Sequence, residues 1–242
     1  MSKIRNLIGI FGWKTGENSF GSAISYIEFF SQYGEVRIIS PTEPIDDRFD
    51  LIVVPGGPDV DPNRYNAMPH FFTSKPDPIR EYLDTKVLTQ YIDLNIPVFG
   101  ICRGLQSIAV LFGARLMQNM HHETSESMKR WDTVHELTLQ DSHFEERYKK
   151  GRPGRLKVNS LHHQCVSDTG FPDELEILAR HDGKGAHHAI EAIGHRVLPI
   201  YAVQYHPEEL GFEYVSDCMI QELLERSPNY VEEVMFEEVE NN

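Results

Sequence analysis

The segment IPVFGICRGLQ, residues 96–106, constrains the fold more than any other part of the 242-residue chain. Its first half is an apolar run typical of a buried strand. A helical pattern follows, with apolar residues at i, i+3, i+4 and i+7 from Leu105. Cys102, flanked by glycines, stands between the two, as in a nucleophile elbow. The segment therefore predicts a strand, a tight turn at Cys102 and a helix packed closely on the strand.

Two interpretations of Cys102 compete. A free cysteine is most often a small buried hydrophobic residue. At the N-terminus of a helix, however, the helix dipole favours the thiolate, which is the nucleophilic form. The Gly-x-Cys-x-Gly context favours the second interpretation, and a base elsewhere in the chain is needed to support it.

Apolar runs alternate with helical patterns through the first half of the chain. Strands are expected at Leu7–Phe11, Val36–Ile39 and Leu51–Val54, and helices at Ser22–Tyr33 and Ile79–Leu94. In the first helix, Ile24, Ile27 and Phe30 would form the buried face. This alternation predicts an α/β fold with a mainly parallel central sheet and helices on both faces.

The second half of the chain has shorter strands, several of which alternate apolar and polar residues. They are expected at Val134–Leu139, Arg155–Val158, Leu175–Ala179, Ala189–Ile193 and Ile200–Gln204. Such a pattern indicates extra antiparallel strands added to the sheet. A helix is expected at Phe212–Leu224, before an acidic tail at about 228–242. We predict a single domain over residues 1–242, with a long, proline-containing loop at 61–78 and a solvated loop at 142–155.

Composition excludes several classes of function. The net charge of −14 disfavours non-specific binding to nucleic acid, and no apolar run is long enough to cross a membrane. Three cysteines without a Cys-x-x-Cys motif favour a reducing, cytoplasmic setting. The 12 histidines include pairs at 121–122, 162–163 and 187–188, but none has the spacing of a zinc site. We therefore expect no metal and no cofactor.

The sequence VQYHPE, residues 203–208, supplies a base for the cysteine. His206 follows a predicted strand, and Glu208 comes two residues later, across a proline that fixes the local backbone. Glu208 could orient the imidazole while the other ring nitrogen faces Cys102. An oxyanion hole would use the amide of Arg103, directly after the cysteine, and an amide of the Pro55-Gly56-Gly57 segment. That segment could also be a simple turn.

Several motifs together resemble one family. They are PGGPDVDPNRY at 55–65, GICRGLQ at 100–106, VNSLHHQ at 158–164, Asp182-Gly183 with IEAI at 190–193, and VQYHPE at 203–208. In this order they are similar to the class I glutamine amidotransferase superfamily, and most to its γ-glutamyl-γ-aminobutyrate hydrolase-like family. The resemblance implies a flavodoxin-like α/β fold and a Cys-His-Glu triad that cleaves γ-glutamyl amides.

The resemblance also implies a role for each matching residue. Cys102 would be the nucleophile, His206 the base and then acid, and Glu208 the residue that orients His206. The amides of Gly57 and Arg103 would form the oxyanion hole. The γ-glutamyl group would be held by Gln106, Asn159, Ser160, Leu161 and His162. Cleavage would proceed through a glutamyl thioester that water then hydrolyses.

The chain departs from the family pattern at three places. The elbow helix lacks the usual asparagine and paired glycine, the pair Arg80-Glu81 stands where the family has Arg-Asp, and an extra segment lies between Gly183 and Ile190. None of these touches the triad. They leave open which amine the substrate carries, since variable loops should form that side of the site.

Three functions are compatible with these observations. The first is a stand-alone hydrolase of a small γ-glutamyl amide. The second is a glutaminase that supplies ammonia to a separate synthetase, which would be its partner. The third is a silent binding or regulatory module, which the intact Cys102, His206 and Glu208 disfavour. Nucleic acid and membranes are not expected as partners, and a homodimer is left open.

Overall fold

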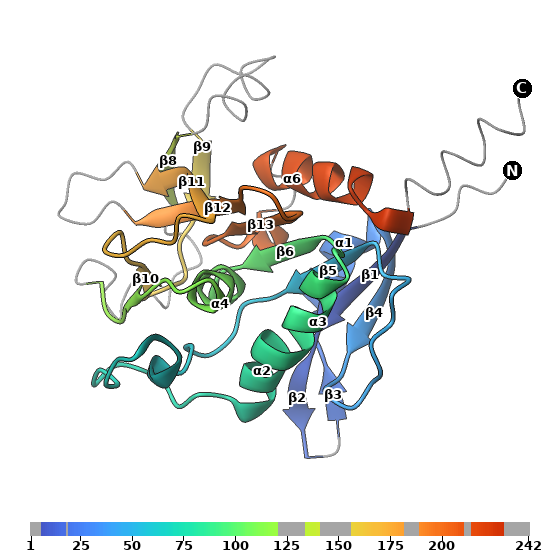
Figure 1. Ribbon diagram of the computed structural model, residues 1–242, viewed down its shortest axis with the longest axis horizontal. Helices are drawn as coiled ribbons and strands as arrows, with labels where there is room; N and C mark the ends of the chain where they lie inside the picture. The colour runs from blue at the N-terminus through green and yellow to red at the C-terminus, as the bar shows by residue number, and fades with distance from the viewer. Residues whose placement is uncertain are drawn as a thin grey trace, which may run out of the picture.

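In the part of the chain that the structure describes, the fold is built on a mixed sheet of nine strands, in the order β4-β1-β5-β6-β13-β12-β11-β8-β9 (Figure 1). The computed structural model describes residues 6–17, 19–120, 134–140, 156–181, 189–210 and 214–229. The parallel part comprises β4 (Gly34–Ile39), β1 (Asn6–Phe11), β5 (Leu51–Val54), β6 (Val98–Ile101) and β13 (Ile200–Val203). The antiparallel part comprises β12 (Ile190–His195), β11 (Leu175–His181), β8 (Val134–Leu139) and β9 (Leu156–Asn159).

Helices cover both faces of the parallel part. On one face lie α1 (Ile24–Ser31) and α6 (Tyr214–Glu225), and on the other α2 (Pro78–Tyr82), a π-helical turn (Leu83–Val87), α3 (Leu88–Asp93) and α4 (Arg103–Leu111) (Figure 1). The sheet residues are divided between the two faces by the strand period: Leu51 and Val53 pack with α1 and α6, while Ile52 and Val54 pack with α3 and α4. The predicted α/β architecture is therefore confirmed.

The pairing of β13 differs from the prediction. The segment Ile200–Gln204 was expected among the antiparallel strands, but β13 pairs in parallel with β6 and antiparallel with β12. It therefore joins the two parts of the sheet. All four residues of β13 are buried, so both faces of this strand must be covered by apolar groups. The centre of the sheet provides such cover, and an exposed edge does not.

Smaller elements refine the prediction elsewhere. The segment after β1 forms a hairpin of β2 (Trp13–Gly16) and β3 (Ser19–Gly21). A second short pair is formed by β7 (Leu116–Met117) and β10 (Cys165–Val166). The loop at 61–78 holds a 3₁₀ turn at Pro62–Tyr65. The helix predicted at 79–94 is interrupted by the π-helical turn, a feature often found near functional sites.

Some predictions lie outside the described residues: the loop at 142–155, the tail beyond 229, and the histidine pairs at 121–122 and 187–188. Across the ranges that the structure does describe, none of the helices combines the length and apolar character needed to cross a bilayer.

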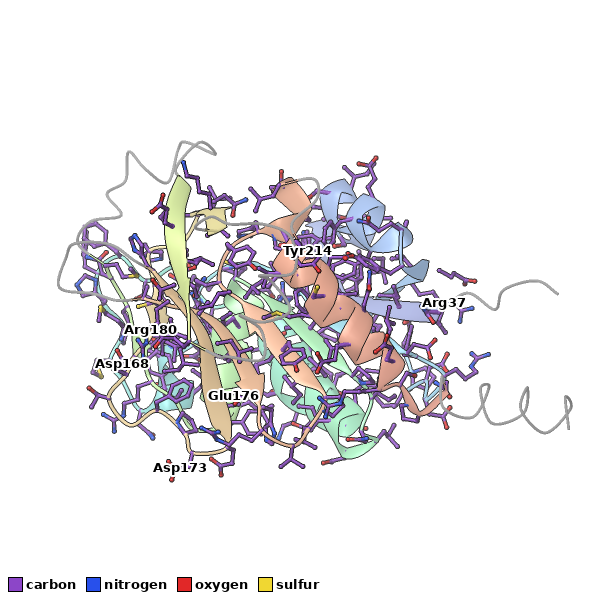
Figure 2. All side chains as sticks on the ribbon, turned by 90° about the horizontal axis from the view of Figure 1, so that it is seen from above. Arg37, Asp168, Asp173, Glu176, Arg180 and Tyr214 are labelled. Carbon is purple, nitrogen blue, oxygen red and sulfur yellow. The ribbon has the colours of Figure 1, made fainter. Side chains whose placement is uncertain are left out.

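Seen from above, Arg37 on β4 and the Arg180–Asp168 ion pair lie at opposite ends of the molecule (Figure 2).

The strand register brings distant segments to one edge of the sheet. In β5 and β6, Val54 pairs with Gly100, and in β6 and β13, Ile101 pairs with Val203. These pairings are parallel, so the residues that follow each strand emerge side by side. The Pro55-Gly56-Gly57 segment, Cys102 and His206 therefore meet at the carboxyl edge, where ligands bind in open α/β sheets.

Candidate active site

Cys102 occupies a strained turn between β6 and α4. Its backbone has φ 53° and ψ −106°, outside the regions that a residue with a side chain ordinarily adopts. Such a conformation costs on the order of 1–3 kcal/mol and persists only where its surroundings impose it. The turn is fixed by the Cys102 amide, which donates to the Val203 carbonyl at 2.8 Å, and by the close approach of helix and strand. A Cβ on Gly104 would lie 1.9 Å from the Val54 carbonyl oxygen, so only glycine fits there. The predicted elbow is present.

His206 and Glu208 form a hydrogen-bonded pair beside this turn. His206 Nδ1 lies 2.7 Å from Glu208 Oε1, and the carboxylate is buried at the start of a 3₁₀ helix, Pro207–Glu209. The backbone of His206 is held on both sides by Asn159: its N–H donates to Asn159 Oδ1, and its carbonyl accepts from Asn159 Nδ2, both at 2.8 Å. The imidazole position is therefore set by a carboxylate and by two backbone contacts.

The electrostatics of the pair favour a charged imidazole. Burial by itself would lower the pKa of His206, but its charge and hydrogen-bond interactions with Cys102, and then those with Glu208, raise that pKa well above its ordinary value. Cys102 and His206 both lie beside Gly56, where a Cβ would be 3.7 Å from Cys102 Cβ and 3.0 Å from His206 Cε1. The arrangement suits an imidazolium that pairs with a thiolate and can later give up its proton.

The Pro55-Gly56-Gly57 segment packs directly against this pair. A Cβ on Gly56 would lie 3.0 Å from His206 Cε1, 3.7 Å from Cys102 Cβ and 2.8 Å from the Tyr26 hydroxyl. The backbone thus passes where no side chain could be accommodated. Of the amides predicted to form an oxyanion hole, those of Gly57 and Arg103 have no protein acceptor among the described residues, whereas the Gly56 amide donates to Tyr26 Oη at 3.0 Å.

Tyr26, on α1, is the site residue that the sequence reasoning missed. Its hydroxyl lies 3.4 Å from His206 Nδ1 and accepts the Gly56 N–H, so it links the glycine segment to the His206–Glu208 pair. Burial, then the nearby Glu208 and Cys102, raise the pKa of Tyr26 well above its ordinary value, and the phenol therefore stays protonated.

The buried face predicted for this helix was right only in part. Phe30 is buried as expected, but Ile24 is 70% exposed, and Tyr26 and Phe29 are buried in its place, with Tyr33 packed against the same cluster. These aromatic residues also follow the i, i+3, i+4, i+7 pattern, and they form T-shaped contacts with each other and with Trp13 of the hairpin. An aromatic stripe on the helix was thus the signal that could have pointed to Tyr26.

Replacement of Tyr26 by phenylalanine should lower kcat for the reaction of this site by roughly 10-fold, because the buried Gly56 amide loses its acceptor and the imidazole loses a neighbour. Steady-state kinetics checks this. The matched control is Tyr33→Phe, which removes a hydroxyl bonded to Asp217 at 2.9 Å on the same part of the chain. Equal losses of kcat in the two variants would contradict a role for Tyr26 in the site.

Of the residues expected to hold substrate, Asn159 contacts His206 directly, and Gln106 and His162 meet at the Gln164 carbonyl. The side chain of Gln106 is buried and donates to the Gln164 carbonyl at 3.0 Å and to Gln204 Oε1 at 3.1 Å. His162 is buried, with Nδ1 2.9 Å from the same carbonyl. The others in this set are Asn159, which holds His206, the buried Ser160 and the partly buried Leu161. Their binding of a γ-glutamyl group stays a prediction.

No group of three or more metal-ligating side chains suited to a metal ion occurs within the part of the chain that the structure describes. His162 and His163 instead have separate carboxylate partners: His162 Nε2 is 3.6 Å from Glu191 Oε1, and His163 Nε2 is 3.0 Å from Asp59 Oδ1. Both histidines thus serve local contacts on different elements, as expected for neighbours that point to opposite sides.

Comparison with known proteins identifies the family. Residues 37–208 match the sequence model of peptidase C26. The chain belongs to this family. Its members are class I glutamine amidotransferase-like, so the resemblance drawn from the motifs is confirmed.

Individual relatives of this C26 chain agree. YvdE, a glutamine amidotransferase-like protein of Lactococcus lactis subsp. lactis (strain IL1403), is 33% identical over 193 residues, which cover 76% of this chain and 79% of YvdE. One component of the glutamine-hydrolyzing GMP synthase of Pyrococcus abyssi (strain GE5 / Orsay) is 30% identical over 189 residues, covering 76% and 82% of the two chains. A glutamine amidotransferase structure from Thermotoga maritima shares the fold, with a TM-score of 0.55, 14% identity and coverage of 93% and 91%.

Proposed function

We propose that this C26 protein is a cysteine-dependent hydrolase of γ-glutamyl amide bonds, in glutamine or in a small γ-glutamylamine. One observation carries the proposal: Cys102 is held in a strained turn against an imidazole whose other side is bonded to a buried carboxylate. A structural cysteine needs neither the strain nor the partners. Family membership adds the substrate class, because relatives include glutamine-hydrolyzing enzymes.

In the first half of the proposed reaction, the Cys102 thiolate attacks the γ-carbonyl carbon and forms a carbon–sulfur bond. Negative charge moves to the carbonyl oxygen, where the N–H groups of Gly57 and Arg103 donate to it. As the tetrahedral intermediate collapses, the carbon–nitrogen bond breaks, and the His206 imidazolium gives its proton to the departing amine. The product of this half is a glutamyl thioester and free amine.

In the second half, water replaces the amine. Neutral His206 takes a proton from the water molecule while the water oxygen attacks the thioester carbon. The same oxyanion hole stabilises the negative charge that develops on the carbonyl oxygen. Collapse expels the Cys102 thiolate and releases glutamate, which restores the imidazolium–thiolate pair. Glu208 keeps the imidazole in one orientation through both halves.

A second candidate has one observation in its favour. The chain matches most of a GMP synthase component that, by its name, works within a larger synthase. This C26 protein would then be a glutaminase that hands ammonia to a separate synthetase partner. The chemistry at Cys102 would be the same, and only the fate of the amine would differ. A silent binding module is the third candidate, and the strained, partnered cysteine disfavours it.

Amine release by the purified protein distinguishes these candidates. The panel comprises glutamine, γ-glutamyl-aminobutyrate, γ-glutamyl polyamines and γ-glutamyl dipeptides, with isoglutamine, whose amide is on the α-carboxyl group, as a matched control substrate. We expect kcat/KM for one γ-glutamylamine to exceed that for glutamine by at least about 10-fold, with no turnover of isoglutamine. Weak turnover of glutamine alone would favour the ammonia-supplying glutaminase, and no turnover of any compound would overturn the hydrolase.

A further inference from the structure

A fully buried arginine packs against the glycine segment: a Cβ on Gly57 would lie 2.9 Å from Arg80 Nη1, whereas a Cβ on Gly56 would face His206 and Cys102. Arg80, from α2, is 0% exposed, and its guanidinium forms two short hydrogen bonds to the main chain. Nη1 donates to the Gly56 carbonyl and Nη2 to the Pro55 carbonyl, each at 2.7 Å. Burying a guanidinium is costly, so bonds of this kind indicate a specific task. The reaction proposed above gives Arg80 no step of its own.

These two bonds fix the orientation of two successive peptide planes. In a trans peptide the carbonyl and the N–H that follows it point in opposite directions. The Pro55 carbonyl points to Arg80, and the Gly56 N–H indeed points the other way, to Tyr26 Oη at 3.0 Å. The Gly56 carbonyl also points to Arg80. By the same geometry, the Gly57 N–H is aimed away from Arg80, toward the side on which Cys102 lies.

A single carboxylate connects this arginine to the second proposed oxyanion donor. Asp84, in the π-helical turn, is fully buried and makes an ion pair with the Arg80 guanidinium, its Oδ1 3.6 Å from Nε. It also accepts a hydrogen bond from Nη1 of Arg103, the residue whose amide follows Cys102. Burial alone would raise the pKa of Asp84, but Arg103 and Arg80 hold that pKa below its ordinary value, so the carboxylate stays charged.

Glu81 extends this connection toward the surface. Its Oε1 accepts from Arg103 Nη2 at 2.6 Å, and its Oε2 from Arg64 Nη1 at 3.2 Å. Arg64 in turn donates to Ser107 Oγ of the elbow helix at 2.7 Å. The cluster of Arg64, Arg80, Glu81, Asp84 and Arg103 thus ties the glycine segment, the loop after it and the elbow helix into one rigid support.

We infer that Arg80 is a positioning residue that aims the Gly57 amide into the oxyanion hole, and that Asp84 fixes this amide relative to the amide of Arg103 by forming ion pairs with both arginine side chains. The inference deepens the proposed function, because it rests on an oxyanion forming at this site. It makes the π-helical turn part of the catalytic support: the turn places Asp84 where it reaches both arginines.

The test compares two reactions of Cys102 in wild type and in Arg80→Lys. Acylation by p-nitrophenyl acetate forms a carbon–sulfur bond through a tetrahedral oxyanion and releases p-nitrophenolate, so it needs the two amides. Alkylation by iodoacetamide displaces iodide without an oxyanion, and reports only the thiolate. Lysine keeps the charge but lacks the planar guanidinium fork that holds two successive carbonyls at fixed positions. We expect the ratio of acylation to alkylation rates to fall by about 10- to 100-fold, and kcat for a γ-glutamyl amide to fall with KM little changed.

Control variants separate positioning from stability. Ser227→Ala removes a buried hydrogen bond to Asp50 at the opposite end of β5, and should lower the melting temperature with an unchanged rate ratio. Glu81→Gln, at a partly exposed position, weakens the ion pair with Arg103 and should lower the ratio of acylation to alkylation rates a few-fold. This variant replaces Arg80→Lys in the test if Arg80→Lys does not fold. An unchanged ratio in folded Arg80→Lys or in Glu81→Gln would overturn the inference. A different result would contradict the proposed function: wild type that is acylated by p-nitrophenyl acetate but cleaves no γ-glutamyl amide.

Discussion

Replacement of Cys102 by alanine is expected to lower kcat for γ-glutamyl amide hydrolysis by at least about 10⁴-fold, which corresponds to roughly 5 kcal/mol of activation free energy. Without the sulfur no thioester forms, and the remaining oxyanion hole and base can assist only a direct attack by water. The measurement is amine release over hours at high enzyme concentration, together with mass spectrometry for a glutamyl adduct of wild type that the variant lacks.

The matched control is Cys218→Ala, which makes the same substitution on α6, at a partly buried cysteine outside the site. It should keep kcat within about twofold, as is usual for a change of this size away from the reacting groups. Activity that survives in Cys102→Ala, or that is lost equally in Cys218→Ala, would contradict the thioester mechanism.

Replacement of Glu208 by glutamine is expected to lower kcat by roughly 10³-fold, since the amide can hold the imidazole but cannot stabilise its charge or enforce one tautomer. The pH profile should change as well. Burial lowers the pKa of His206, while Cys102 and then Glu208 raise it. Loss of the carboxylate therefore lowers that pKa, and the alkaline limb of kcat/KM, where the imidazolium loses its proton, should move to lower pH.

Glu209→Gln is the control for this prediction, because it makes the same substitution one residue further along the 3₁₀ helix, at an exposed side chain. Its rate and pH profile should match those of wild type. An alkaline limb that stays in place in Glu208→Gln would mean that the carboxylate does not act on His206.

The sequence predicted those parts of the site that depend on local pattern. A strand, a glycine-flanked cysteine and a helix follow one another within 11 residues, so the elbow at Cys102 could be recognised directly. The His-Pro-Glu spacing likewise predicts the observed bond between His206 and Glu208. That these two segments meet depends on the parallel pairing of β6 with β13, which no local pattern encodes. The family resemblance implied only that Cys102 and His206 act together.

The residues missed or misplaced depend on partners far away in the chain. Tyr26 was not among the predicted site residues, because the apolar set that includes Ile24 and the aromatic set that includes Tyr26 both follow a helical period. Its contact with Gly56, 30 residues away, decides between them. Arg80 was named only as the first residue of the Arg80-Glu81 pair and was given no role, since a charged residue in an amphipathic helix is ordinarily solvated. Its burial follows from two main-chain carbonyls that only the folded sheet edge presents.

The central position of β13 has a consequence for biosynthesis. The strand lies between β6 and β12, yet it leaves the ribosome after both of them, and it carries the segment that holds the base. A nascent chain that has made Cys102 therefore still lacks the neighbour that shapes its turn and the imidazole that activates it. On the proposed function, such a chain can begin no thioester chemistry until β13 and His206 have been made.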